Sequence, residues 1–228
     1  MESVLARKKA YEEKIVKLIL LKEGTYDLEE NVLITCPMSF HGAGQNKTIL
    51  QLHGIQIQGT KKEIKKRVNM QGMTMKGSSG SGLYASNGLS FLCKDMTFTH
   101  CGQFGVCANK TKGRLINCVI TQCMLSGIYC RRNALIELEG DQTKVDGNVT
   151  LGGSYNYGLN TFDTSSRIHL LYPLTKESVS TNNNNGNYNS TGTIQTVDTL
   201  ESLTLTHLRM CTTHKRFQVS RDAYLIIL

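Results

Sequence analysis

The sequence predicts an all-β fold, a parallel β-helix in which short strands stack rung upon rung, with about 22–23 residues per rung. Three segments, 72–83, 95–106 and 117–128, carry the same succession of apolar, small and polar residues. A repeat of this length is typical of solenoid architectures. Inside the repeats the apolar residues alternate, as Met73 and Met75 do, and this is the period of a strand with one buried face.

The glycines of the repeat set its register. Gly82, Gly105 and Gly127 follow one another at intervals of 23 and 22 residues. We expect them to stack in one column, at a bend where a side chain does not fit or φ is positive. The same register places Cys101 over Cys123. We expect these thiols to stay reduced, because side chains stacked in register point the same way and a disulfide needs a χ₃ of about 90°.

Two other repeat architectures do not fit the pattern. Leucine-rich repeats have a similar period, but their leucine and asparagine signature is missing. Helical repeats need apolar positions three and four apart over about a dozen residues, and these segments lack them. A solenoid of short strands remains.

The chain divides into three parts. Residues 1–14 predict a short capping helix, with apolar residues on one side and Lys and Glu elsewhere. Residues 15–198 form the predicted β-helix, and 199–228 form a C-terminal extension that covers the far end of the solenoid or packs along its side. Within the β-helix, 60–68 is a basic loop between rungs. The Asn-rich segment 180–192 predicts a mobile loop.

Strands alternate with turn residues along the whole predicted β-helix. The first strand lies in "KIVKLILLKEGTYDL", and "NVLITCPMSFHGAGQNKTILQLHGIQIQG" follows it. Beyond the three clear repeats the rungs continue through 134–140, 144–151, 157–163, 167–174 and 193–198. Gly158 follows Gly127 by 31 residues, so this turn of the coil carries an insertion.

Composition agrees with this architecture. The 228 residues include 21 Gly, only two Pro and no Trp, which suits many bends and few bulky core residues. No apolar run approaches the roughly 20 residues of a membrane span. The N-terminal residues contain no apolar segment of the secretory type, so we expect no membrane span and no signal peptide.

The eight cysteines predict buried thiols and no metal site. They are not spaced as CxxC pairs, and the six His are dispersed, whereas zinc ligands cluster. Several Cys occupy repeat positions that Met, Ala or Tyr take elsewhere, so we expect small apolar core residues. Reduced cysteines favour an intracellular or virion setting. Four N-x-[ST] triplets arise readily by chance in a chain rich in Asn and Thr.

The opening rungs resemble a known family. "LKEGTYDLEENVLITCPMSFHGAGQNKTIL" contains a GTY after an apolar strand (24–26), then Pro37, a G-x-G (42–44) and Thr48. These features are similar to the first turns of right-handed parallel β-helix proteins of the pectin lyase-like superfamily. More finely, the chain resembles uncharacterised β-helix repeat proteins of algae and large DNA viruses. The resemblance covers about residues 15–197 and implies a fold, with activity on polysaccharides as a weaker implication.

The sequence offers no clear catalytic carboxylate pair. A glycoside hydrolase needs two carboxylates about 5–10 Å apart, which on this scaffold would stand at matching positions of neighbouring rungs. Asp95 is the only carboxylate in the three clear repeats, and its register neighbours are Gly72 and Asn117. The NTD, DD, GHG and RIK signatures of the polygalacturonase branch are absent. A calcium-dependent lyase would need a carboxylate cluster, and the remaining candidates for either chemistry are Asp141, Asp146 and Asp163.

Basic residues form a clearer pattern. At the 22-residue offset Asn109 aligns with Arg131 and Lys110 with Arg132, and further cations lie in the same turn. We expect one edge of adjacent rungs to carry a cluster of Lys110, Lys112, Arg114, Arg131 and Arg132. With a net charge of +8, such an edge attracts polyanions. The alternative is a solvated turn that keeps the protein soluble. Nucleic acid is disfavoured, since no aromatic residues are interleaved for stacking.

Three functions stay open at this point. The favoured one is a non-catalytic module, without cofactor, that binds an extended ligand, above all an anionic polysaccharide, or serves a structural role. The second is a polysaccharide lyase or glycoside hydrolase, and the third is an intracellular adaptor for a protein partner. Glycan binding without cleavage of uronate polymers favours the first, new unsaturated ends favour the second, and neither favours the third.

Overall fold

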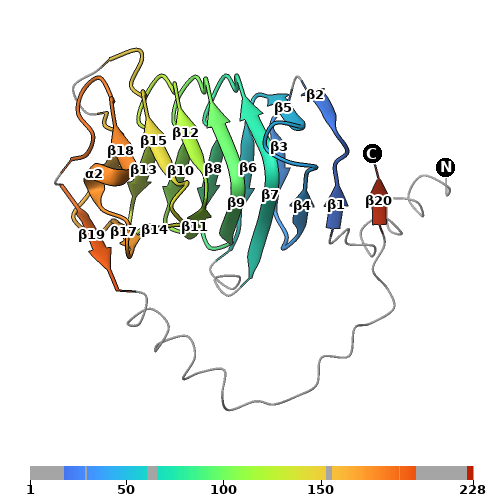
Figure 1. Cartoon of the computed structure of the whole chain (residues 1–228). Coiled ribbons are helices and arrows are strands. Elements are labelled where there is room, and N and C mark those ends of the chain that lie inside the picture. Colours follow the sequence, from blue (N-terminus) through green and yellow to red (C-terminus); the bar gives the residue numbers. More distant parts are fainter. Residues whose placement is uncertain are drawn as a thin grey trace.

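A computed structural model describes residues 18–28, 30–60, 66–152, 156–189, 191–198 and 225–227. The described chain is almost entirely β-strand and winds into a parallel β-helix of about seven turns, as Figure 1 shows. The predicted fold class is therefore confirmed. The predicted capping helix 1–14 lies outside the described residues, as do most of the basic loop 60–68 and of the extension 199–228.

Each turn of the coil has three faces. The first face contains β1 (Leu18–Leu20), β4 (Ser39–His41), the starts of β7 (Arg67–Lys76) and β9 (Ser90–Thr99), β11 (Lys112–Ile116), β14 (Leu135–Glu139), β17 (Arg167–Leu171) and β19 (Thr193–Val197). The second contains β2 (Gly24–Leu28), β5 (Thr48–Leu52), the ends of β7 and β9, β12 (Val119–Thr121), β15 (Lys144–Asp146) and β18 (Ser180–Thr181). The third contains β3 (Val32–Ile34), β6 (Ile55–Gln58), β8 (Leu83–Ser86), β10 (Val106–Asn109), β13 (Ile128–Arg131) and β16 (Leu159–Thr161).

The strand register is the one that the repeat predicts. Met73 pairs with Met96, Phe98 with Ile120, and Val106 with Ile128. Alternate side chains enter the interior, where Met, Phe, Ile, Leu and Cys form one continuous core along the axis. Because neighbouring strands lie about 4.8 Å apart, every residue type at a given position forms a row parallel to the axis.

The predicted glycine column forms the bend between the second and third faces. A Cβ added to Gly82 would lie 2.8 Å from the carbonyl oxygen of Gly105, and one added to Gly105 would lie 2.8 Å from that of Gly127. The column continues to Gly158, whose carbonyl oxygen would lie 3.0 Å from a Cβ on Gly127. The three predicted glycines have ordinary φ values, so it is steric overlap with the next rung that demands glycine here.

The same bend contains the cysteine pair and a short ladder of asparagines. Cys101 and Cys123 are fully buried free thiols, and in the following rungs Asn148 and Asn183 take their place. The Asn148 amide oxygen accepts from the backbone N–H of Cys123 (3.1 Å), and the Asn183 amide oxygen accepts from the backbone N–H of Asn148 (2.9 Å). The expectation of a mobile loop at 180–192 was therefore wrong for Asn183, which is buried and satisfies backbone groups of the preceding rung.

The two ends of the coil are built differently. Near the last described rung, the short helix α2 (Lys176–Val179) begins at Thr175, whose hydroxyl accepts from the backbone N–H of Ser178 (3.1 Å). At the other end β20 (Leu225–Ile227) pairs in parallel with β1. The boundaries of the predicted capping helix and C-terminal extension stay predictions. No helix among the described residues is long and apolar enough to cross a membrane.

Candidate functional site

The outer side of the third face is the most distinctive surface of the β-helix. Leu83, Val106 and Ile128 point into the core, so the residue after each points outward. Successive rungs therefore form two outward rows. The first row is Gln56, Tyr84, Cys107, Tyr129 and Asn160, and the second row is Gln58, Ser86, Asn109 and Arg131.

Much of this outward surface is covered by neighbouring side chains. Cys107 is 1% exposed and Tyr129 8%, although both point away from the core. The ring of Phe104 stacks on that of Tyr129, with centroids 4.3 Å apart and an interplanar angle of 11°. Phe162 packs on the other side at 5.8 Å and is itself exposed. Burial raises the pKa of Cys107 to about 12, so this thiol is a packing residue below the aromatic rings.

The loops that precede the third-face strands form a wall beside these rows. Their backbones are joined from rung to rung: Gly80 N–H donates to the His53 carbonyl (3.3 Å), and Gln103 N–H donates to the Gly80 carbonyl (3.0 Å). Between this wall and the strands β6 and β8 lies a hollow of about 340 Å³. It is lined by Asn31, His53, Gln56, Ser79, Gly80, Ser81, Tyr84 and Gln103.

The hydroxyl of Tyr84 connects this hollow to the next rungs. It accepts hydrogen bonds from Asn109 Nδ2 (3.0 Å) and from Arg131 Nη2 (3.3 Å), although Arg131 lies two rungs away. The hydrogen bond to Tyr84 raises the pKa of Arg131. Asn109 Oδ1 and Arg131 Nε are buried without a partner among the described residues. Unpaired buried polar atoms reduce stability, so this cluster is arranged for a purpose other than packing.

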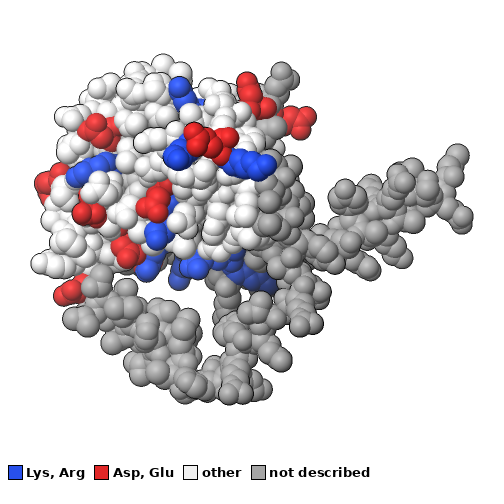
Figure 2. Space-filling view, turned by 45° about the vertical axis from the view of Figure 1, so that its right-hand side comes forward, with Lys and Arg blue, Asp and Glu red and all other residues white. Residues whose placement is uncertain are grey.

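Three of the five predicted cations lie on one exposed edge, the bend that leads from the third face to the first. Lys110 and Arg132 occupy equivalent bend positions, and Lys112 begins the next strand of the first face. Arg67 and Arg167 begin β7 and β17. We call Arg67, Lys110, Lys112, Arg132 and Arg167 the basic edge. All are exposed, and Figure 2 shows Lys and Arg gathered along the lower side of the molecule.

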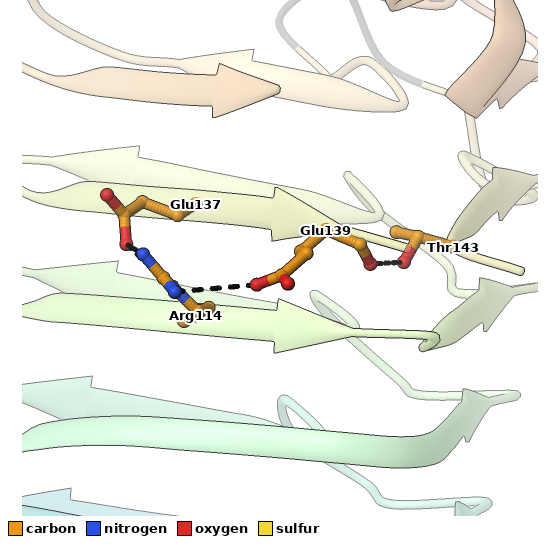
Figure 3. A network of polar contacts seen from close by, with 4 residues as sticks. All are labelled: Arg114, Glu137, Glu139 and Thr143. Atoms are coloured by element: carbon orange, nitrogen blue, oxygen red, sulfur yellow. Dashed lines mark hydrogen bonds and ion pairs between the residues drawn. The ribbon is translucent and has the colours of Figure 1, made fainter. Parts of the chain in front are cut away.

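The two other predicted cations are engaged elsewhere. Arg131 lies on the third face against Tyr84, as described above. Arg114 lies on the outer side of the first face, where its Nη2 contacts Glu137 Oε2 at 2.8 Å and its Nη1 contacts Glu139 Oε2 at 3.4 Å. Figure 3 shows this network, in which Thr143 also donates to the backbone carbonyl of Glu139. Arg114 is therefore neutralised, and the sequence register alone did not reveal its partners.

Glu137 and Glu139 are a carboxylate pair that the sequence analysis did not consider. They lie two residues apart on β14 and so share one face of the strand. In the next rung His169 pairs with Glu137; burial lowers the pKa of His169, and the Glu137 charge opposes that shift. Because Arg114 contacts both carboxylates, the cluster is charge-compensated on an open strand surface, and the hollow lies on another face.

The candidate carboxylates Asp141, Asp146 and Asp163 do not converge. Asp141 is exposed in the turn between β14 and β15. Asp146 ends β15 on the second face and accepts from Thr181 Oγ1 (2.6 Å) and Asn182 Nδ2 (2.9 Å). Asp163 follows the third face. The described residues contain no group of three or more His, Cys, Asp or Glu side chains that could hold a metal ion.

Asp163 has a structural task at the basic edge. Its carboxylate accepts from the backbone N–H of Arg132, from the hydroxyls of Ser165 and Ser166, and from the backbone N–H of Ser165. Partial burial raises its pKa, but these hydrogen bonds outweigh burial, and the pKa of Asp163 is lowered overall. The residue is therefore a fixed carboxylate that positions Arg132 and is poorly suited to act as a general acid.

The sequence contained a signal for the third-face cluster that was not used. The offset that aligns Asn109 with Arg131 also aligns Tyr84 with Cys107 and Tyr129. Outward positions could thus have been assigned by counting one residue beyond each buried apolar residue. The contact of Arg131 with Tyr84 crosses an intermediate rung, however, and no register rule predicts it.

Comparison with known proteins gives little beyond the fold. No protein-family model matches the sequence, and no curated protein matches it either. A solved structure that is similar is the A-module of the mannuronan C-5 epimerase AlgE4 of Azotobacter vinelandii, at 12% identity, 86% coverage of this chain and 89% of that one. The TM-score of 0.27 is too low for the likeness to carry an argument about the site. The fold rests on the strand pairing itself.

Proposed function

We propose that this β-helix is a non-catalytic module that binds an extended anionic polysaccharide across its third face and basic edge. The observation that carries the proposal is the continuity of the surface from the hollow at Tyr84, through Asn109 and Arg131, to Lys110 and Arg132. Membership of the pectin lyase-like superfamily, with polysaccharides as ligands, is part of the same proposal.

The surface combines the groups that such a ligand requires. Ligand sites are concave, with aromatic side chains and a few placed polar groups that fix orientation. Here the aromatic surface comes from Tyr84, Phe104 and Phe162. The cations of the basic edge make no ion pair with a described carboxylate. They recur along the axis at multiples of about 4.8 Å, which suits a polymer with regularly spaced negative charges.

Binding of a uronate polymer to the full chain tests the proposal. We expect the triple variant Lys110→Gln, Lys112→Gln and Arg132→Gln to bind at least about tenfold more weakly by isothermal titration calorimetry. The matched control, Lys22→Gln, Lys47→Gln and Lys76→Gln, removes the same charge from other parts of the coil. Equal losses in the two variants would mean that net charge alone attracts the polymer, and would overturn the assignment of the site.

One observation favours a second function, that of a polysaccharide lyase. A lyase removes a proton beside a uronate carboxylate, and this requires a proton-accepting side chain near a cation that stabilises the developing charge. Tyr84 and Arg131, 3.3 Å apart at their polar atoms, supply both groups. New unsaturated ends, detected by ultraviolet absorbance and lost in Tyr84→Phe, would establish cleavage. Binding without such ends supports the non-catalytic module.

A further inference from the structure

We propose that the polysaccharide is a mixed polymer, in which an uncharged sugar occupies the hollow beside Tyr84 and an acidic sugar follows it towards Arg131. This inference rests on the proposed function and specifies the class of ligand. It starts from the chemistry of the hollow, whose described lining contains amides, hydroxyls, one imidazole and one phenol, with no Lys, Arg, Asp or Glu.

An acidic sugar in the hollow would lack a counter-charge. Moving a carboxylate from water to a partly enclosed place is costly unless the charge is paired and hydrogen-bonded. In a polymer of uronate alone every sugar carries a carboxylate, so one of them would have to enter the hollow. An uncharged sugar avoids this cost entirely.

The lining also offers what an uncharged sugar needs. The side-chain amides of Asn31, Gln56 and Gln103 both donate and accept hydrogen bonds, as the hydroxyls of Ser79 and Ser81 do. Sugar hydroxyl and acetamido groups have the same dual character. The volume of about 340 Å³ lies at the small end of ligand sites, which begin at about 300 Å³, and so fits one sugar rather than several.

The hydroxyl of Tyr84 marks the boundary between the two kinds of sugar. The residue lines the uncharged hollow, while its hydroxyl contacts the guanidinium of Arg131. Beyond Arg131 the next cations are Lys110 and Arg132 of the basic edge. Charge therefore begins on one side of Tyr84 only. A ligand that follows this surface changes from uncharged to anionic at the same point.

Three oligosaccharides of equal length test the inference at pH 8, where an unperturbed imidazole is neutral. One is a uronate homopolymer, one a neutral glucan and one an alternating polymer of uronate and N-acetylhexosamine. We expect the alternating polymer to bind at least about tenfold more tightly than either homopolymer. A uronate homopolymer that binds as tightly as the alternating one overturns the inference.

A substitution in the hollow sharpens the test. Gln56→Lys places a cation in the lining, and we expect it to raise the affinity for the uronate homopolymer several-fold without improving the alternating polymer. Gln58→Lys is the matched control, because Gln58 points outward from the same strand but does not line the hollow. Both residues are exposed, so both variants should fold. Equal gains from the two variants would contradict the uncharged subsite.

The two proposals fail in distinguishable ways. If the basic-edge triple variant loses binding but the homopolymer and the alternating polymer bind alike, the proposed function stands and the mixed-polymer inference falls. If no anionic polymer binds, or the triple variant binds as well as its control, the proposed function falls and the inference falls with it.

Discussion

Two bends of the same coil follow opposite rules. The bend from the second to the third face contains the column Gly82, Gly105 and Gly127, packed against the next rung. The bend from the third to the first face contains Lys110 and Arg132, whose side chains are exposed. Both bends recur once per rung, but only the first is filled by the core.

The difference shows which positions the fold leaves open to function. At the glycine bend any Cβ collides with the rung above, so packing alone dictates the residue. At the basic edge, by contrast, Lys110 and Arg132 adopt φ values of 57° and 54°, which L-residues other than Asn and Asp rarely do. Asn87 holds the equivalent position one rung earlier. Cations at strained positions indicate that charge is required there.

The largest expected effect is at the glycine bend. Gly105→Val would place side-chain atoms against Ile120 and the Gly127 carbonyl oxygen. We expect a loss of about 2 kcal/mol or more in the free energy of unfolding, measured by urea denaturation. Lys112→Val is the control at the basic edge and should change stability by about 0.5 kcal/mol or less. Equal losses would remove the distinction between the two bends.

The fold could be predicted because a solenoid repeats its constraints. Each rung applies the same strand period and the same glycine, so errors in one copy are corrected by the others. The pairings of Met73 with Met96 and of Val106 with Ile128 followed from counting alone. The Asn ladder escaped prediction because Asn148 and Asn183 replace cysteines where insertions break the count.

The site was only partly predictable, since side-chain partners depend on more than register. Lys110 and Arg132 are adjacent as the sequence indicates. Arg114, two residues beyond Lys112, is neutralised because alternation on β14 aims both Glu137 and Glu139 at it. Arg131 instead extends back across a rung to Tyr84. Cations equivalent in sequence thus differ in availability.

A smaller effect is expected where Asp163 holds the basic edge. Its folded pKa is lowered from the ordinary value of 3.8, so it contributes stability above that pH, and the contribution is lost as pH falls through the lowered pKa. Because the group is largely exposed, we expect Asp163→Asn to cost about 1 kcal/mol or less at pH 7. Urea denaturation at pH 7 and pH 3 measures this cost. It should shrink at pH 3, and a cost independent of pH would contradict the role assigned to the carboxylate.

The smallest effect has the opposite sign and bears most directly on the comparison. Lys110→Asn keeps the bend but installs a residue that tolerates φ near 57°. We expect a gain of about 0.5 kcal/mol in the free energy of unfolding, together with weaker binding of a uronate polymer. Lys112→Asn is the control, because Lys112 starts a β-strand and its replacement relieves no strain. A loss of stability in Lys110→Asn with unchanged binding would mean that lysine is present for the fold, and the basic edge would then obey the same rule as the glycine bend.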